Sequence, residues 1–211
     1  MADNVHEGDL DLSDVTSPEG LELPERVTGD LDLRSLTSAE GLKLPGHVGG
    51  ILWLSGLTSA DGLKLPEHVD GALSTLALDG LTSAEGLKLP EHVGGGLALD
   101  GLTSAKGLVL PRHVGGVLIL DGLTSAKGLV LPRHVGLFLI LRGLTSADGL
   151  TFPEYVGEDL WLWALTSAKG LNLPAHVGGD IGLWSLDPDE YDQEVHGPDA
   201  LGGKVQFSKP D

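Results

Sequence analysis

The sequence repeats itself with a constant period along almost its whole length. One Leu or Val in each unit serves as an anchor residue, and Thr-Ser follows it in eight of nine units. The anchors are evenly spaced except for one step that is three residues longer. The anchors are Val15, Leu36, Leu57, Leu81, Leu102, Leu123, Leu144, Leu165 and Leu186, which gives a 21-residue unit. Such a period is typical of a solenoid, in which each unit forms one coil and buries its apolar residues only against neighbouring coils.

One unit, LTSAEGLKLPEHVGGGLALDG at residues 81–101, shows how a coil is built. The alternation Leu-Ala-Leu-Asp at residues 97–100 predicts a strand with one buried face. The Thr-Ser pair, closed by Gly86, predicts a short turn or a one-turn helix. A second alternation at residues 87–89 predicts a second strand, either true sheet or merely extended chain, which ends at Pro90 because proline cannot continue a hydrogen-bonded ladder.

These patterns predict a β-solenoid of about eight to nine right-handed, parallel coils. Residues 1–9 are expected to form an N-terminal cap, residues 10–186 the solenoid, and residues 187–211 an acidic C-terminal cap or tail. The single longer step is interpreted as a three-residue loop insertion near residues 72–74. Caps are expected because an open stack of coils would otherwise expose its core at both ends.

The spacing of Leu97, Leu99 and Leu102 gives the pattern Leu-x-Leu-x-x-Leu, which resembles the leucine-rich repeat. The recurring GGxLxLxGL is also similar to the coils of receptor L domains, and the resemblance covers about residues 8–186. The Asn that is usual in leucine-rich repeats is missing here, and Thr-Ser stands nearby. The resemblance implies a parallel-sheet solenoid used for protein recognition, with no particular partner.

Composition and charge exclude several classes of function. The chain has 41% hydrophobic residues, no Cys and a net charge of -18. An acidic chain is a poor ligand for nucleic acid or an anionic membrane surface, and no stretch has the apolar length of a membrane helix. The first residues lack the cationic and apolar segments of a signal peptide, so a cytoplasmic location is expected.

Equivalent residues of successive coils should stack into columns, and columns that hardly change are expected to build the coil. The Thr-Ser column is interpreted as turn closure rather than an ice-binding ladder, since adjacent hydroxyls on a strand would face different ways. Another column holds His47, His68, His92, His113, His134 and His176, with Arg26 and Tyr155 at the same position. It is interpreted as packing or hydrogen bonding, with metal binding or pH response as the alternative.

No catalytic group, metal site or cofactor site is predicted. Ser, His and Asp recur in nearly every unit, so their presence carries no information about a triad. The glycines match neither a phosphate loop nor a dinucleotide fingerprint. The acidic segment DPDEYDQEVHGPD, at residues 187–199, has oxygen ligands suited to calcium but lacks the pattern of an EF-hand, so a solvated cap is expected.

Function is expected where the columns vary, on the outward side of the first strand of each unit. Alternation assigns a set of apolar and aromatic residues to this side, including all four Trp of the chain. The predicted interface residues are Ile51, Trp53, Val117, Ile119, Phe138, Ile140, Trp161, Trp163 and Trp184. Contiguous apolar surface usually marks an interface, and aromatic residues are favoured anchors of interfaces.

The sequence therefore predicts a non-enzymatic protein that recognises another protein or a second copy of itself. Two alternatives remain for the apolar side: the tail at 187–211, with its VQF, folds over it, or Trp161, Trp163 and Trp184 bind carbohydrate or another small ligand together with nearby Asp.

On another side of the coil, the charge of equivalent residues changes along the chain. Units one to four carry mainly Glu or Asp there, and units five and six carry Lys and Arg, which could set the direction of assembly between copies.

Overall fold

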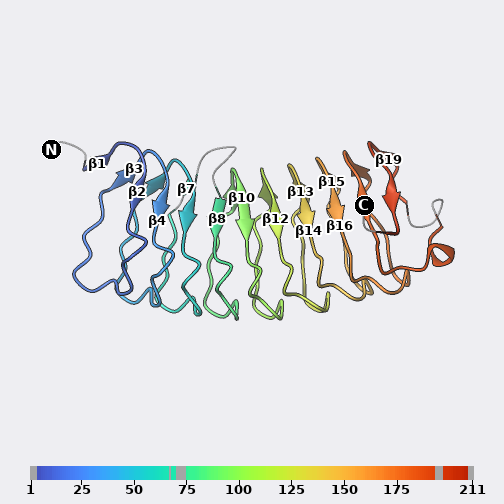
Figure 1. Cartoon of the computed structure of the whole chain (residues 1–211), viewed down its shortest axis with the longest axis horizontal. Helices are drawn as coiled ribbons and strands as arrows, with labels where there is room; N and C mark the ends of the chain where they lie inside the picture. Colours follow the sequence, from blue (N-terminus) through green and yellow to red (C-terminus); the bar gives the residue numbers. More distant parts are fainter. Residues whose placement is uncertain (1–3, 67, 70–74, 193–196, 209–211) are drawn as a thin grey trace.

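The computed structural model describes residues 4–66, 75–192 and 197–208, and the backbone of residues 68–69. The chain forms a β-solenoid of about nine turns with about 21 residues per turn, in which all paired strands run parallel. Figure 1 shows the coils side by side along one axis, with the strands along the upper part and turns below. The predicted solenoid is confirmed.

One continuous sheet of ten strands runs the length of the described structure, and we call it the long sheet. Its strands are β2 (Leu10–Asp11), β4 (Leu31–Asp32), β6 (Leu52–Trp53), β8 (Thr75–Ala77), β10 (Gly96–Ala98), β12 (Leu118–Ile119), β14 (Leu139–Ile140), β16 (Leu160–Trp161), β18 (Ile181–Gly182) and β20 (Val205–Gln206). We number the coils by their strand in the long sheet, from coil 1 with β2 to coil 10 with β20. The ten strands bound about nine full turns. Neighbouring coils lie about 4.8 Å apart, the usual spacing of hydrogen-bonded strands.

The other strands are formed by the His-Val pair, or by the residues that take its place. These strands form two sheets, β1-β3-β5-β7 and β9-β11-β13-β15-β17-β19, which divide at the insertion. Their bounds are β1 (Val5–His6), β3 (Arg26–Val27), β5 (His47–Val48), β7 (His68–Val69), β9 (His92–Val93), β11 (His113–Val114), β13 (His134–Val135), β15 (Tyr155–Val156), β17 (His176–Val177) and β19 (Ala200–Leu201).

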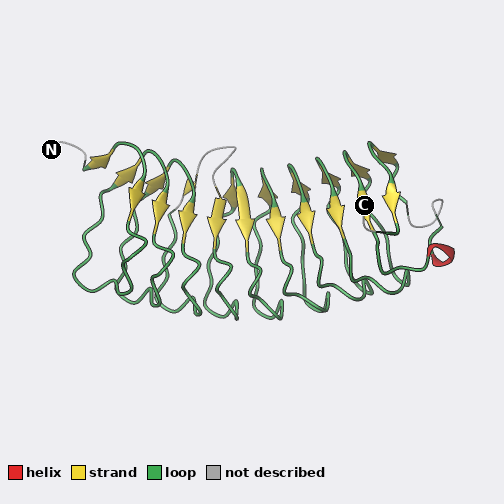
Figure 2. Cartoon of the chain, viewed as in Figure 1, coloured by secondary structure: helices red, strands yellow, loops and turns green. Residues whose placement is uncertain are grey.

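The second predicted strand, at residues 87–89, is not part of a sheet. These residues carry no strand hydrogen bonds, and the ladder begins only after Pro90, at His92. Proline therefore precedes the strand instead of ending it. The same holds in the other described coils, so a coil has two short strands and an unpaired segment between the Thr-Ser turn and His-Val, which we call the return segment. Figure 2 shows these segments as loop.

The predicted turn after Thr-Ser is present, and it is a turn rather than a helix. Ser83 Oγ accepts a hydrogen bond from the backbone N–H of Glu85 at 3.2 Å, and Leu87 N–H donates to the Ala84 carbonyl at 3.1 Å. Gly86 has φ of +79°, a left-handed conformation that favours glycine. The Thr hydroxyls join coils, as where Thr145 Oγ1 donates to the Thr124 carbonyl at 3.0 Å.

Stacked aliphatic columns fill the interior. In coil 5 the inward residues Leu97, Leu99 and Leu102 are fully buried, and Val114 of the His-Val strand is also fully buried. Equivalent residues in neighbouring coils have the same environment and form one continuous core. Each coil buries its apolar groups only by contact with the coils on either side, so the array is stabilised by stacking.

Both ends of the chain take part in the stack. At the N-terminus, β1 pairs with β3. At the C-terminus, β19 pairs with β17 and β20 pairs with β18, and in both pairs the partners lie further apart in sequence than the usual period. The segment Val205–Gln206 therefore extends the long sheet edge to edge and does not lie over its outer side. A 3₁₀ helix, η1 (Pro188–Glu190), precedes this last coil.

The insertion predicted near residues 72–74 lies outside the described residues. The register shows its effect: β6 pairs with β8 through Leu52 and Leu76, a longer step than the usual period, and the next pair, Leu76 with Leu97, returns to that period. Within the described ranges, the structure contains no helix long and apolar enough to cross a membrane.

Candidate functional site

The nine predicted interface residues all lie on the outer side of the long sheet or directly after its strands. Each is partly exposed, whereas the leucines that alternate with them are buried. They do not form one uniform surface. The structure divides them into three groups with different surroundings: Ile51 and Trp53 on coil 3, four aliphatic or aromatic residues on coils 6 and 7, and three Trp on coils 8 and 9.

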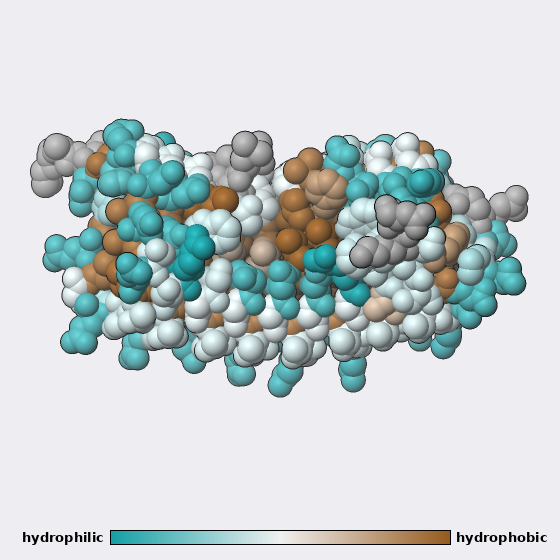
Figure 3. Space-filling view, viewed as in Figure 1, coloured by the Kyte–Doolittle hydropathy of each residue, from teal (hydrophilic) through white to brown (hydrophobic). Residues whose placement is uncertain are grey.

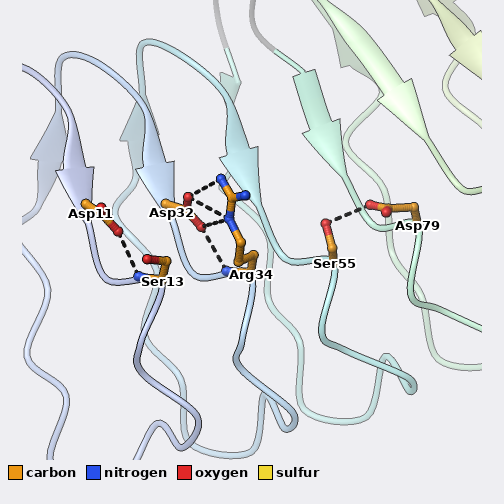
Figure 4. A network of polar contacts seen from close by, with 6 residues as sticks. All are labelled: Asp11, Ser13, Asp32, Arg34, Ser55 and Asp79. Atoms are coloured by element: carbon orange, nitrogen blue, oxygen red, sulfur yellow. Dashed lines mark hydrogen bonds and ion pairs between the residues drawn. The ribbon is translucent and has the colours of Figure 1, made fainter.

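The first group is covered by charge. The guanidinium of Arg34 lies over the Trp53 ring, 5.1 Å from its centroid. Arg34 is itself held by Asp32, with Nε at 2.8 Å from Oδ2, and its side chain lowers the pKa of that carboxyl. Figure 4 shows this pair beside Asp11, whose Oδ1 accepts a hydrogen bond from the backbone N–H of Ser13, as Asp32 Oδ1 accepts one from the backbone N–H of Arg34. Arg34 therefore covers one face of the Trp53 ring.

The third group stacks on itself. Trp163 and Trp184 are parallel, with centroids 4.0 Å apart, and Trp161 approaches both at 5.9–6.1 Å. Arg142 lies over Trp163 at 4.7 Å and forms an ion pair with Asp121. Trp163 is therefore enclosed between Arg142 and Trp184. Gly182 makes the cluster possible, because a Cβ there would overlap the Trp161 ring.

The second group has no such cover. Val117 and Ile119 on coil 6 lie beside Phe138 and Ile140 on coil 7, and we call these four residues the apolar patch. Ile119 pairs with Ile140 in register, and the four side chains are all partly exposed. Figure 3 shows a hydrophobic area over β12 and β14, with paler surface of intermediate hydropathy on either side. The patch lies near the middle of the long sheet.

A row of carboxylates borders this patch. Asp79, Asp100 and Asp121 occupy one column on coils 4, 5 and 6, with Ser55 donating to Asp79 at 2.8 Å at one end (Figure 4) and Arg142 at the other. The Asp100 Oδ1 atom is buried without a hydrogen-bond partner. Burial, with Asp121 and Asp79 nearby, raises the pKa of Asp100.

The histidine column forms a ring stack on the second strand. His113, His134, Tyr155 and His176 follow one another with centroids 4.6 Å apart at each step. Burial, followed by the neighbouring His134 and His92, lowers the pKa of His113. No cluster of three His, Asp or Glu side chains able to hold a metal ion occurs in the ranges that the structure describes. Stacking explains why Tyr fits the same position as His.

The return segments of coils 5 and 6 carry a feature that the column comparison of the sequence missed. Val109 and Val130 are 74% and 75% exposed, far more than other large apolar residues of the described chain. They line a groove of about 620 Å³ together with Pro111, Arg112 and Arg133. The signal was present in the sequence, since this position is otherwise polar. Its other residues are Glu22, Lys43, Lys64, Lys88, Thr151 and Asn172.

Comparisons with family models, curated proteins and solved structures find nothing that matches this chain significantly. The chemistry of its surfaces is therefore the basis for functional inference.

Proposed function

We propose that the protein is a non-enzymatic self-assembly scaffold that uses the apolar patch to bind a second copy of the chain. One observation carries this proposal: the patch is the part of the outer side where neighbouring apolar side chains lack the cover that Arg34 gives Trp53 and Arg142 gives Trp163. Apolar surface of this kind usually marks a contact with another molecule.

A second copy is the favoured occupant because the patch is compact and self-complementary. A two-fold axis through its centre would place Ile119 and Ile140 of one copy on the same residues of the other, as in an isologous dimer. The high net charge opposes association only through charges that lie close to one another in the two copies. Charges further apart than about 8 Å are screened at physiological ionic strength. Asp159, beyond the patch on coil 8, limits its extent.

The resemblance to leucine-rich repeats supports the same class of function, since such solenoids present a parallel sheet to protein partners. The alternative of carbohydrate binding by Trp161, Trp163 and Trp184 is less favoured. A sugar ring needs an open aromatic face, and the two faces of Trp163 are occupied by Arg142 and Trp184.

Sedimentation velocity of the full chain over a range of micromolar concentrations tests the proposal. Ile140→Asp is expected to weaken the association at least about tenfold, because it buries a charge in the contact. Asn172→Asp adds the same charge at an exposed site away from the patch and is expected to leave association unchanged. Circular dichroism would establish that both variants keep the fold. Equal association of the wild-type chain and Ile140→Asp would contradict the proposal.

A further inference from the structure

The Thr-Ser turns and return segments of coils 5 and 6 together form a basic surface on a strongly acidic chain. We call it the basic patch, and its residues are Lys106, Val109, Arg112, Lys127, Val130 and Arg133. All four cations are exposed. None of them forms an ion pair with another described residue, although ion pairs join Arg34 to Asp32, Arg142 to Asp121 and Lys169 to Asp148. The patch therefore combines unpaired positive charge with two exposed valines.

Coils 3 and 4 carry the opposite charge at the same positions. The column of Lys106 and Lys127 holds Asp61 and Glu85 in these coils, and the column of Arg112 holds Glu91 in coil 4; these acidic side chains are exposed. Because every coil follows the same path, the two surfaces have the same spacing between columns and between coils. The chain thus carries an acidic surface that matches its basic patch in dimensions.

A two-fold axis between coils 4 and 5 brings these surfaces together in two copies. The axis runs along the strand direction, so the rotation reverses the order of the coils and keeps the order of the columns. It places Lys106 opposite Glu85 of the second copy, Arg112 opposite Glu91, and Lys127 opposite Asp61. The two valines then face Lys88 and Lys64, whose aliphatic stems can cover apolar surface while the ammonium groups stay in water.

Charge also selects this register over its neighbours. An axis at coil 4 would place Glu85 of one copy on Glu85 of the other, and an axis between coils 3 and 4 would place Asp61 on Glu85. Both arrangements bring like charges together, which opposes association and excludes incorrect pairings. The distribution of charge along the turns and return segments therefore specifies one antiparallel pairing.

We infer that the turns and return segments of coils 3–6 form a second self-recognition surface, on which two copies bind antiparallel about an axis between coils 4 and 5. This surface uses another side of the coil than the apolar patch and stands independently of the proposed function. Where both contacts form, each copy has two different isologous surfaces, and copies extend into an open array instead of closing as a dimer.

A charge-swap experiment tests the inference in full-length chains that carry Ile140→Asp, so that the apolar patch does not contribute. One variant adds Lys106→Glu and Lys127→Glu, and the other adds Asp61→Lys and Glu85→Lys. Each variant alone would bring like charges together and is expected to dimerise at least about tenfold more weakly than the Ile140→Asp parent. Mixed together, the two variants have opposite charges at all four contacts and are expected to form a heterodimer.

The control variant carries Lys106→Arg and Lys127→Arg, keeps the charge, and is expected to dimerise like the parent. Raising the salt concentration should weaken this contact and leave the apolar contact intact. The inference is overturned if the mixture sediments as monomers, or if each charge-swap variant dimerises as well as the parent. Weaker association of Ile140→Asp than of the wild-type chain, together with an intact charge-swap heterodimer, would support the apolar contact separately, so the two proposals can fail independently.

Discussion

Asp30 accepts a hydrogen bond on Oδ1 from the backbone N–H of Ile51, the residue at the same position one coil further along, at 2.7 Å. Asp159 makes the same contact with Asp180 at 2.7 Å. In each case the carboxylate occupies the space beside a glycine of the next coil, Gly50 or Gly179, where a Cβ would overlap it. Asp in one coil and Gly in the next thus form a structural pair.

Asp30→Ala is expected to destabilise the protein by about 1–2 kcal/mol, because a partly buried backbone N–H loses a charged acceptor. Asp30→Asn keeps an oxygen at the same place and should lose only a fraction of that stability. Denaturant unfolding followed by circular dichroism measures both changes. Equal stability of the Ala and Asn variants would show that the hydrogen bond contributes nothing.

The two strands of a coil show what the sequence can and cannot predict. The constant repeat period is sufficient to predict the parallel solenoid, and alternation around Leu97 is sufficient to predict the first strand. The predicted second strand is misplaced because Leu-Lys-Leu before Pro90 alternates like a strand, while the hydrogen bonds fall at the His-Val pair. Alternation reports which side chains are buried, not which backbone groups are paired.

The candidate surface is predictable only as a set of outward columns. Sequence cannot show that Arg34 covers Trp53 or that Arg142 covers Trp163, because these contacts join different coils. The role of residues 200–206, which supply β19 and β20, is also hidden, because the connection before them is longer than in the other coils. Their sequence Ala-Leu-Gly-Gly-Lys-Val nevertheless resembles the usual His-Val-Gly-Gly-x-Leu. Both cases depend on geometry between coils and not on the pattern within one coil.

Gly136→Ala is expected to destabilise the protein by about 1–3 kcal/mol, the usual cost of overpacking. A Cβ at Gly136 would overlap the Gly115 carbonyl of the preceding coil, a backbone atom that cannot move without shifting the stack. Gly46→Ala is the matched control, since its nearest neighbour, the Glu25 carbonyl oxygen, is 3.9 Å from the added carbon. Thermal unfolding should separate the two variants, and similar melting temperatures would contradict the close approach of coils.

Asp100→Asn is expected to raise the melting temperature at pH 7 by about 1–2 °C, a small effect because the side chain is partly solvated. The fold raises the pKa of Asp100, chiefly through burial. Its protonated form therefore favours the folded state, and this contribution is lost as the pH rises through the raised pKa. At neutral pH the Asp100 charge destabilises the fold, and replacement by Asn removes it. The gain should vanish below the ordinary pKa of Asp, near pH 3.9.

Asp32→Asn supplies a control with the opposite sign. The hydrogen bond from Arg34 lowers the pKa of Asp32, so its ionised form stabilises the fold above the ordinary pKa and this contribution is lost on acidification. The Asn variant is expected to melt lower than the wild type at pH 7 and to approach it in acid. Differential scanning calorimetry at both pH values compares the two variants. A gain at pH 7 for Asp32→Asn, or a loss for Asp100→Asn, would contradict these assignments.

The ring stack makes the ionisation of His113 depend on a neighbour one coil away. The pKa of His113 is lowered by burial first and by the nearby His134 and His92 second. His134→Ala removes a ring that stacks on His113 at 4.6 Å and also a group that becomes positively charged in acid. Both changes favour the charged form of His113, so its pKa should rise toward the ordinary value.

An NMR titration of the His113 ring signals in the two proteins measures this shift. His176→Ala is the matched control, because Tyr155 and His134 separate His176 from His113 in the stack. That variant should leave the His113 titration unchanged while removing the same kind of ring. If His134→Ala leaves the pKa of His113 where it was, stacking between coils does not set it. If His176→Ala shifts it equally, the effect spreads through the whole stack rather than through direct contact.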